Sequence, residues 1–238
     1  KVFILLLIMT ELKWPKSLVV IRHGESEQNA VLDLFEKDLD KNLLMHQKEI
    51  RDADIELTDK GINQAQKTGE LLAKEEPFDI CLASPYKRTI QTAENILSKF
   101  DYEIKLHTDN RLREKEFGRL HAFSEAEIKE KYPEEFEDRK REGKYWYRLP
   151  RGENYPDVEM RVHSFLGKLN RDYPGKRVLI ITHQVPYKIF RTLFGHLKEE
   201  EVISLPETPN CGIQEFKINT KDSSEGKLVL NFYDKIAY

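Results

Sequence analysis

Residues Ser17 to Asn29 read SLVVIRHGESEQN, an apolar run (18–21) that ends abruptly in Arg22, His23 and Gly24. A short run rich in β-branched residues is typical of a strand buried on both faces of a mostly parallel sheet. Open α/β sheets bind ligands at the carboxyl ends of their strands, so we expect Arg22 and His23 at such an edge. Gly24 lets the backbone turn and approach a ligand closely.

The chemistry of this pair is suited to phosphate. A neutral imidazole can accept a phosphoryl group, and a guanidinium holds phosphate oxygens through a bidentate fork. The three residues alone are equally typical of a strand end with a solvated arginine and a loop histidine. The choice between these interpretations depends on the rest of the chain.

Composition indicates one α/β domain over residues 17–238, preceded by an N-terminal extension, 1–16. Of the 238 residues, 39% are hydrophobic, enough for a core, and 34% are charged, as exposed helices require. The net charge of -3 argues against nucleic acid or an anionic membrane as the main partner. An anion site would therefore be a local basic pocket.

The cysteines and the N-terminus bear on the cellular compartment. Cys81 and Cys211 are the only cysteines, which argues against a disulfide framework and favours a reducing, cytoplasmic protein. The segment KVFILLLIM, Lys1 to Met9, resembles a short signal peptide but lacks a cleavage site and is too short to span a membrane. We favour Met9 as the biological start.

Further strands and helices alternate along the chain, which predicts a three-layer α/β/α fold with a mixed, mostly parallel central sheet. Thr58 and Asn154, the latter with Asp157, are expected to cap two of the helices. Residues 30–55 are expected to form a helical insertion over the rim of the site, as a lid or simply as a solvated helix. Strands are predicted at 78–83, 104–107, 177–182, 212–218 and 228–233, with the last two at the sheet edges.

The longer string R-H-G-E-S-E-x-N resembles the signature of the histidine phosphatase superfamily, which includes the phosphoglycerate mutases. The family fold is a mixed, mostly parallel sheet flanked by helices, in agreement with the alternation of elements. The resemblance implies that His23 is the phosphorylated nucleophile. It also implies that Arg22 and Asn29 bind phosphate.

Three later motifs continue the resemblance. The first, which starts at Ser84, reads S-P-x-x-R-x-x-Q-T-A and implies that Arg88 binds phosphate. Arg88 lies on a predicted helix that Ser84 is expected to cap. That helix is expected to pack through Ile90, Ala93, Leu97 and Phe100. L-x-E-x-x-x-G implies that Glu114 is the general acid, with Glu116 as the alternative. His183, which ends the run RVLIIT, corresponds to the second catalytic histidine.

The resemblance is greater to the phosphatase branch than to the mutases. Gln184 stands where the mutases have glycine, and the stretch 136–155 lacks their Arg-Arg and Pro-rich string. YPEEF and GENY are similar to fructose-2,6-bisphosphatases and related broad phosphatases, although Glu125 replaces a tyrosine of that branch. This implies that the substrate is bound by Arg139, Lys144, Tyr155, Gln184 and Lys188.

The expected activity is therefore hydrolysis of a phosphomonoester on a small phosphorylated metabolite, through a phosphohistidine. No metal or other cofactor is expected, because arginines supply the positive charge that phosphoryl transfer needs. The alternatives are a 2,3-bisphosphoglycerate-dependent phosphoglycerate mutase and, from another class, an inactive phosphate-binding or scaffold module. The oligomeric state stays open, a homodimer included.

Overall fold

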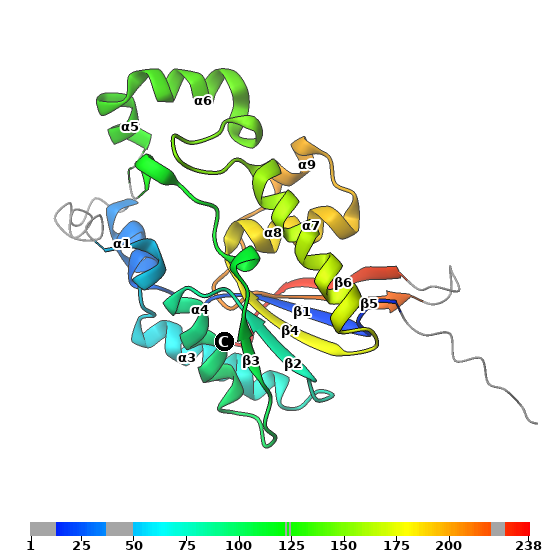
Figure 1. Cartoon of the computed structure of the whole chain (residues 1–238). Helices are drawn as coiled ribbons and strands as arrows, with labels where there is room; N and C mark the ends of the chain where they lie inside the picture. The colour runs from blue at the N-terminus through cyan, green and yellow to red at the C-terminus, as the bar shows by residue number, and fades with distance from the viewer. Residues whose placement is uncertain (1–12, 37–49, 122, 124, 220–226) are drawn as a thin grey trace, which may run out of the picture.

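The computed structural model describes residues 13–36, 50–121, 123, 125–219 and 227–238 (Figure 1). The sheet has the strand order β3-β2-β4-β1-β5-β6. Four of these strands run parallel, and β5 and β6 each run antiparallel to the preceding strand in that order, which confirms the mixed, mostly parallel sheet. The bounds are β1 Ser17–Arg22, β2 Ile80–Ala83, β3 Leu106–Thr108, β4 Arg177–Thr182, β5 Ile213–Asn219 and β6 Lys227–Lys235.

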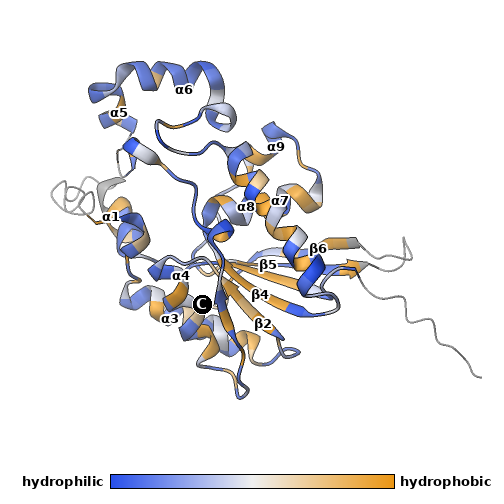
Figure 2. Cartoon of the chain, viewed as in Figure 1, coloured by the Kyte–Doolittle hydropathy of each residue, from blue (hydrophilic) through white to orange (hydrophobic). Residues whose placement is uncertain are grey.

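Helices cover both faces of the sheet, as the predicted three layers require. Helices α3 (Asp59–Leu72) and α4 (Lys87–Leu97) lie on one face (Figure 1). Helices α7 (Tyr155–Asp172) and α8 (Gln184–Gly195) lie on the other. Figure 2 shows that the strands between them are mostly hydrophobic, as strands buried on both faces must be.

The alternation of side chains along each strand divides the core into two halves. In β1, Leu18 and Val20 pack with residues of α7 and α8, whereas Val19 and Ile21 pack with residues of α3 and α4. All four side chains are at most 1% exposed. Fully burying such a side chain stabilises the fold by roughly 1.5 to 3 kcal/mol, so β1 is held firmly from both sides.

The remaining helices lie around the carboxyl edge of the sheet. Helix α6 is mostly hydrophilic (Figure 2), and it begins at Pro133, shortly after α5 ends at Lys131. The predicted insertion at 30–55 is described only at its ends, and residues 37–49 and 1–12 lie outside the described residues. The bounds are α1 Glu27–Glu36, α5 Glu125–Lys131, α6 Pro133–Trp146 and α9 Glu199–Ser204, with short 3-10 turns at Asp52–Asp54, Asn110–Leu112 and Gly118–Leu120.

Two predicted caps are confirmed and one is wrong. The Thr58 side chain accepts from the Gly61 amide, and Asn154 and Asp157 form a reciprocal capping box. Ser84 does not cap α4, which begins at Lys87 with Tyr86 at the cap position. The hydroxyl of Ser84 instead contacts the side chain of His183.

Two further predictions need correction. Of the two last strands, which were both expected at sheet edges, only β6 is an edge, because β5 pairs with β1 on one side and with β6 on the other. The predicted stripe is correct at Ala93, which is buried, and at Leu97 and Phe100, which are partly buried and pack against the core. The buried residues that it missed include Thr89, Thr92 and Ile96. The two threonines tolerate burial because their hydroxyls donate to carbonyls one turn back, Thr89 to Tyr86 and Thr92 to Arg88.

Candidate active site

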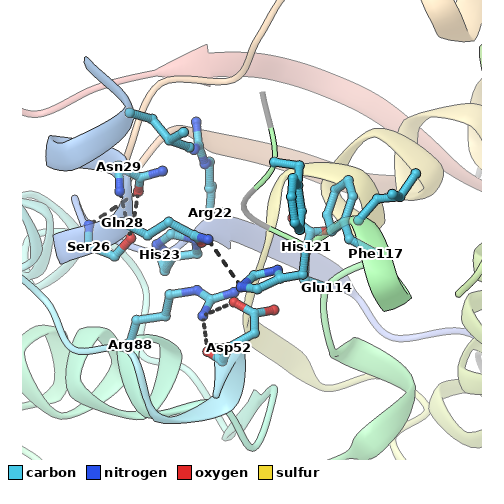
Figure 3. Close-up of a pocket in the computed structure, with 13 residues that line it drawn as sticks. Arg22, His23, Ser26, Gln28, Asn29, Asp52, Arg88, Glu114, Phe117 and His121 are labelled. Atoms are coloured by element: carbon cyan, nitrogen blue, oxygen red, sulfur yellow. Dashed lines mark hydrogen bonds and ion pairs between the residues drawn. The ribbon is translucent and has the colours of Figure 1, made fainter. Parts of the chain in front are cut away.

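The polar residues that follow the parallel strands meet at one edge of the sheet. Arg22 ends β1 and His23 follows it, Glu114 comes after β3, and His183 comes directly after β4. A cavity of about 220 Å³ opens there (Figure 3). Its walls include Arg22, His23, Asn29, Arg88 and Glu114 among the predicted residues, and also Ser26, Gln28, Leu32, Asp52, Phe117, Leu120, His121 and Phe123.

The contacts of His23 fix which of its nitrogens is available for reaction. Its Nδ1 lies 2.7 Å from the carbonyl oxygen of Gly24, so we assign the proton to Nδ1, which donates to that carbonyl. The lone pair is then on Nε2. Burial, and next the positive charges of Arg88 and Arg22, lower the pKa of His23 well below its ordinary 6.5. A neutral imidazole with a free Nε2 is a competent nucleophile at neutral pH.

Gly24 supports this loop in a way that the sequence does not predict. A Cβ at this position would lie 2.5 Å from the carbonyl oxygen of Gly61 in α3. Glycine is therefore required for close packing of α3 against the loop that follows β1.

His183 lies beside His23, with 5.2 Å between the ring centroids, and is fully buried. The hydroxyl of Ser84 accepts from the Tyr86 amide and lies 2.8 Å from Nε2 of His183, so we assign this hydroxyl as the donor to Nε2 and the ring proton to Nδ1. Among the described residues, Nδ1 of His183 has no hydrogen-bond partner. Ser84 thus orients the second histidine, a role that sequence reasoning missed.

Two arginines supply positive charge beside His23. Arg22 donates from Nη1 to the carbonyl of Thr208, and its buried Nε has no partner in the described part of the chain. Arg88 is 3% exposed and donates from Nη1 to the carbonyl oxygen of Asp52 over 2.5 Å. The same nitrogen forms an ion pair of 2.9 Å with the Asp52 carboxylate. The sequence analysis did not identify Asp52.

Asn29 presents an amide donor at the cavity wall. Its Oδ1 accepts from the backbone and hydroxyl of Ser26 and from the side chain of Asn210. Three donors on one oxygen fix the orientation of the amide, so its NH₂ group remains available to a ligand. This arrangement is consistent with the predicted phosphate contact.

Glu114 and Glu116 differ sharply in environment. Glu114 is buried, and its Oε1 accepts from the amides of Lys115 (2.7 Å) and Val185 (3.2 Å), the latter in the first turn of α8. Burial raises the pKa of Glu114 although these amides and Arg88 oppose the shift. Glu116 is exposed and caps the Gly118 amide. Of these two glutamates, only Glu114 lines the cavity that holds His23.

The five predicted substrate-binding residues line a second cavity of about 280 Å³. Phe117, Leu120 and Phe123 line both cavities, so the two adjoin. Lys115, a further cation that the sequence analysis did not identify, is 7% exposed, and burial with the charges of Arg139 and Lys144 lowers its pKa to about 8. The walls carry four cations, Lys115, Arg139, Lys144 and Lys188, and one carboxylate, Glu207.

The described part of the chain has neither a cluster of metal ligands nor a membrane-spanning helix. No three His, Cys, Asp or Glu side chains there are grouped so that they could hold a metal ion. None of the helices there combines the length and apolar character that a membrane span needs. Cys81 and Cys211 are both buried and free.

Comparison with known sequences adds independent evidence. The model of the histidine phosphatase superfamily (branch 1) matches residues 18–229. The chain is 32% identical to a 2,3-bisphosphoglycerate-dependent phosphoglycerate mutase of Treponema denticola over 222 residues, 79% of this chain and 81% of the mutase. It is 33% identical to a fructose-2,6-bisphosphatase of Saccharomyces cerevisiae over 190 residues, 79% of this chain and 36% of the yeast protein. The relatives thus include a mutase and a phosphatase.

Solved structures share the fold at lower identity. A mycobacterial glucosyl-3-phosphoglycerate phosphatase in complex with inorganic phosphate superposes with a TM-score of 0.69 at 20% identity, covering 93% of this chain and 98% of that one. YhfR of Bacillus stearothermophilus gives a TM-score of 0.72 at 23% identity, covering 92% and 97%. These likenesses concern the fold.

Proposed function

The chain belongs to the histidine phosphatase superfamily, and from this premise we propose that it hydrolyses phosphomonoesters through a phosphohistidine on His23. One observation carries the proposal: Nδ1 of His23 donates to the Gly24 carbonyl, which leaves Nε2 as a neutral nucleophile between Arg22 and Arg88. A dead scaffold has no need to keep this histidine neutral and its Nε2 free.

In the first step, Nε2 of His23 attacks phosphorus, and the bond between phosphorus and the ester oxygen breaks. Phosphoryl transfer is catalysed mainly by positioning and by stabilising the non-bridging oxygens. Arg22, Arg88 and Nδ1 of His183, which has no hydrogen-bond partner within the described ranges, are suited to that task. Each such donor contributes roughly 2.7 to 4 kcal/mol in the transition state. Neutral Glu114 protonates the leaving alkoxide.

In the second step, water attacks the phosphohistidine. Glu114, now a carboxylate, accepts a proton from that water, the bond from Nε2 to phosphorus breaks, and orthophosphate is released. The raised pKa of Glu114 favours the protonated form that the first step needs. The two arginines supply the charge that a metal ion supplies in other phosphotransferases, so we propose that turnover is independent of divalent metal.

The second cavity supports a small substrate with another anionic group beyond the reacting phosphate. Its cations outnumber its carboxylate, and it adjoins the nucleophile. Lys188, which is 7% exposed and donates to the Leu205 carbonyl, is a good test position. Lys188→Met should raise KM for a substrate bearing a second anionic group and leave KM for nitrophenyl phosphate unchanged. Lys140→Met, on the exposed side of α6, is the matched control.

Hydrolysis is favoured over mutase activity by Gln184. Its Oε1 accepts from the Thr208 amide at the wall of the second cavity, where the mutases have glycine. A direct comparison is orthophosphate release against interconversion of 3- and 2-phosphoglycerate at saturating 2,3-bisphosphoglycerate. Interconversion that is tenfold faster than release would establish the mutase alternative instead.

The decisive experiment for the proposal is rapid quench with labelled substrate. It should trap an acid-labile, alkali-stable adduct that is absent in His23→Ala. Turnover should also survive dialysis against a chelator. An adduct that persists in His23→Ala, or activity that requires added metal, would refute this mechanism.

A further inference from the structure

Asp52 is the charged residue of the catalytic cavity to which neither the sequence nor the proposed mechanism assigns a role. It lies in the 3-10 turn Asp52–Asp54 and contacts Arg88 twice, through its carbonyl oxygen at 2.5 Å and its carboxylate at 2.9 Å (Figure 3). The Arg88 side chain is 4% exposed and that of Asp52 is 20% exposed. The ion pair is thus largely removed from solvent.

The carboxylate of Asp52 lies where it would repel a phosphate bound to Arg88. Two oxygens bound to one guanidinium lie within roughly 6 Å of each other, so a phosphate on Arg88 is close to Asp52. Like charges at about 4 to 6 Å disfavour each other strongly, most of all in a site shielded from water. Besides Asp52, the titratable side chains of this cavity include the cations of Arg22 and Arg88 and the carboxyl of Glu114, which the proposed mechanism keeps neutral in the first step.

We propose that Asp52 sets the affinity of this site for phosphate by competing with it for Arg88. The carboxylate pairs with Arg88 when the site is empty and lowers the affinity for orthophosphate, which aids release of the product. That the product is orthophosphate rests on the proposed function; the competition itself concerns only anion binding. Asp52 is therefore an affinity-determining residue of the phosphate site.

A substitution by asparagine isolates the charge of Asp52. Asparagine has nearly the same shape and keeps an oxygen for Arg88. The contact from the Asp52 carbonyl to Arg88 is made by the backbone, so it does not depend on the side chain. If Asp52 only oriented Arg88, its loss would weaken phosphate binding, whereas competition predicts tighter binding. The sign of the change therefore distinguishes the two roles.

The test is titration calorimetry of the full chain with orthophosphate, repeated with orthovanadate. Asp52→Asn should bind both on the order of 10-fold more tightly than wild type, the lower end of the effect of one nearby charge. Asp52→Ala, which keeps only the carbonyl contact, should change in the same direction. Asp54→Asn is the matched control, since Asp54 is 57% exposed and pairs with Arg51; its affinity should equal that of wild type.

The outcomes separate the two proposals. Unchanged or weaker binding in both Asp52 variants, with wild type binding normally, would overturn the competition and leave the phosphatase proposal standing. Failure of wild type itself to bind either anion would overturn the phosphate site and both proposals with it. Thermal unfolding of each variant confirms that the compared proteins are folded.

Discussion

Replacing Glu114 with glutamine tests the proton donor without disturbing its surroundings. Oε1 of Glu114 accepts two backbone hydrogen bonds, from Lys115 and Val185, and the amide oxygen of glutamine can accept both. The phosphate-binding arginines and His23 are untouched. The variant therefore lacks only the acidic proton.

The expected loss depends on the leaving group. An alkyl phosphate leaves as a strongly basic alkoxide, and loss of a general acid typically costs roughly 100- to 10,000-fold, or about 2.7 to 5.4 kcal/mol of activation free energy. A nitrophenyl ester leaves as a weak base and needs little protonation, so its loss should be under about 10-fold. The difference between the two esters measures the contribution of the proton.

The assay must isolate the first step, because in the proposed mechanism Glu114 is also the base of the second step. Rapid quench measures the rate of phosphohistidine formation with each ester. Because burial raises the pKa of Glu114 and the protonated form is the donor, the wild-type rate with the alkyl ester should fall as pH rises through that pKa. The glutamine variant should lack this decline.

Glu116→Gln is the control and should react at the wild-type rate, since the Glu116 side chain is exposed and accepts from the Gly118 amide of its own loop. Equal losses for both esters in Glu114→Gln would mean that Glu114 acts through charge or structure and not as an acid. A larger loss in Glu116→Gln would move the acid role to that residue.

Two further predictions concern the second histidine. Ser84→Ala removes the partner of His183 Nε2 and should lower kcat/KM roughly 5- to 150-fold, the effect of about 1 to 3 kcal/mol from a lost buried hydrogen bond. Steady-state kinetics should show no loss in the control Ser98→Ala, whose hydroxyl is exposed. An equal loss in both variants would contradict the role of Ser84 in orienting His183. Burial, and next the charge of Arg88, lower the pKa of His183 well below 6.5, so the unfolded chain binds more protons and stability falls as pH drops below 6.5. His183→Gln should reduce the pH slope of the free energy of unfolding there by up to about 1.4 kcal/mol per pH unit, measured by urea denaturation; an unchanged slope would contradict this.

Strands were the most predictable part of the fold. The runs at 18–21 and 177–182 are continuous, apolar and β-branched, and both are central strands flanked by helices. Their order in the sheet could not be predicted in full, because strand pairing depends on contacts distant in sequence. That is why β5 was expected at an edge although it lies between β1 and β6.

The site residues that were predicted belong to sequence motifs. The residues that were missed take their role from a contact or from burial that no local sequence pattern indicates. Ser84 precedes a proline at a strand end, which is typical of a turn, and its partner His183 lies 99 positions further on. Asp52 lies in a polar stretch without a pattern. Lys115 belongs to a charged run, and no periodicity there indicates that one lysine of that run is buried.

The position of β4 between β1 and β2 has a consequence for how the protein forms during synthesis. Ser17 in β1 pairs with Arg177 in β4, and β2 reaches β1 only through β4. Until residues 177–182 have emerged from the ribosome, the nascent chain therefore cannot join β1 and β2 into this sheet. His23 is synthesised early, but His183 follows the strand that joins the two parts of the sheet. Incomplete chains should therefore lack the proposed activity.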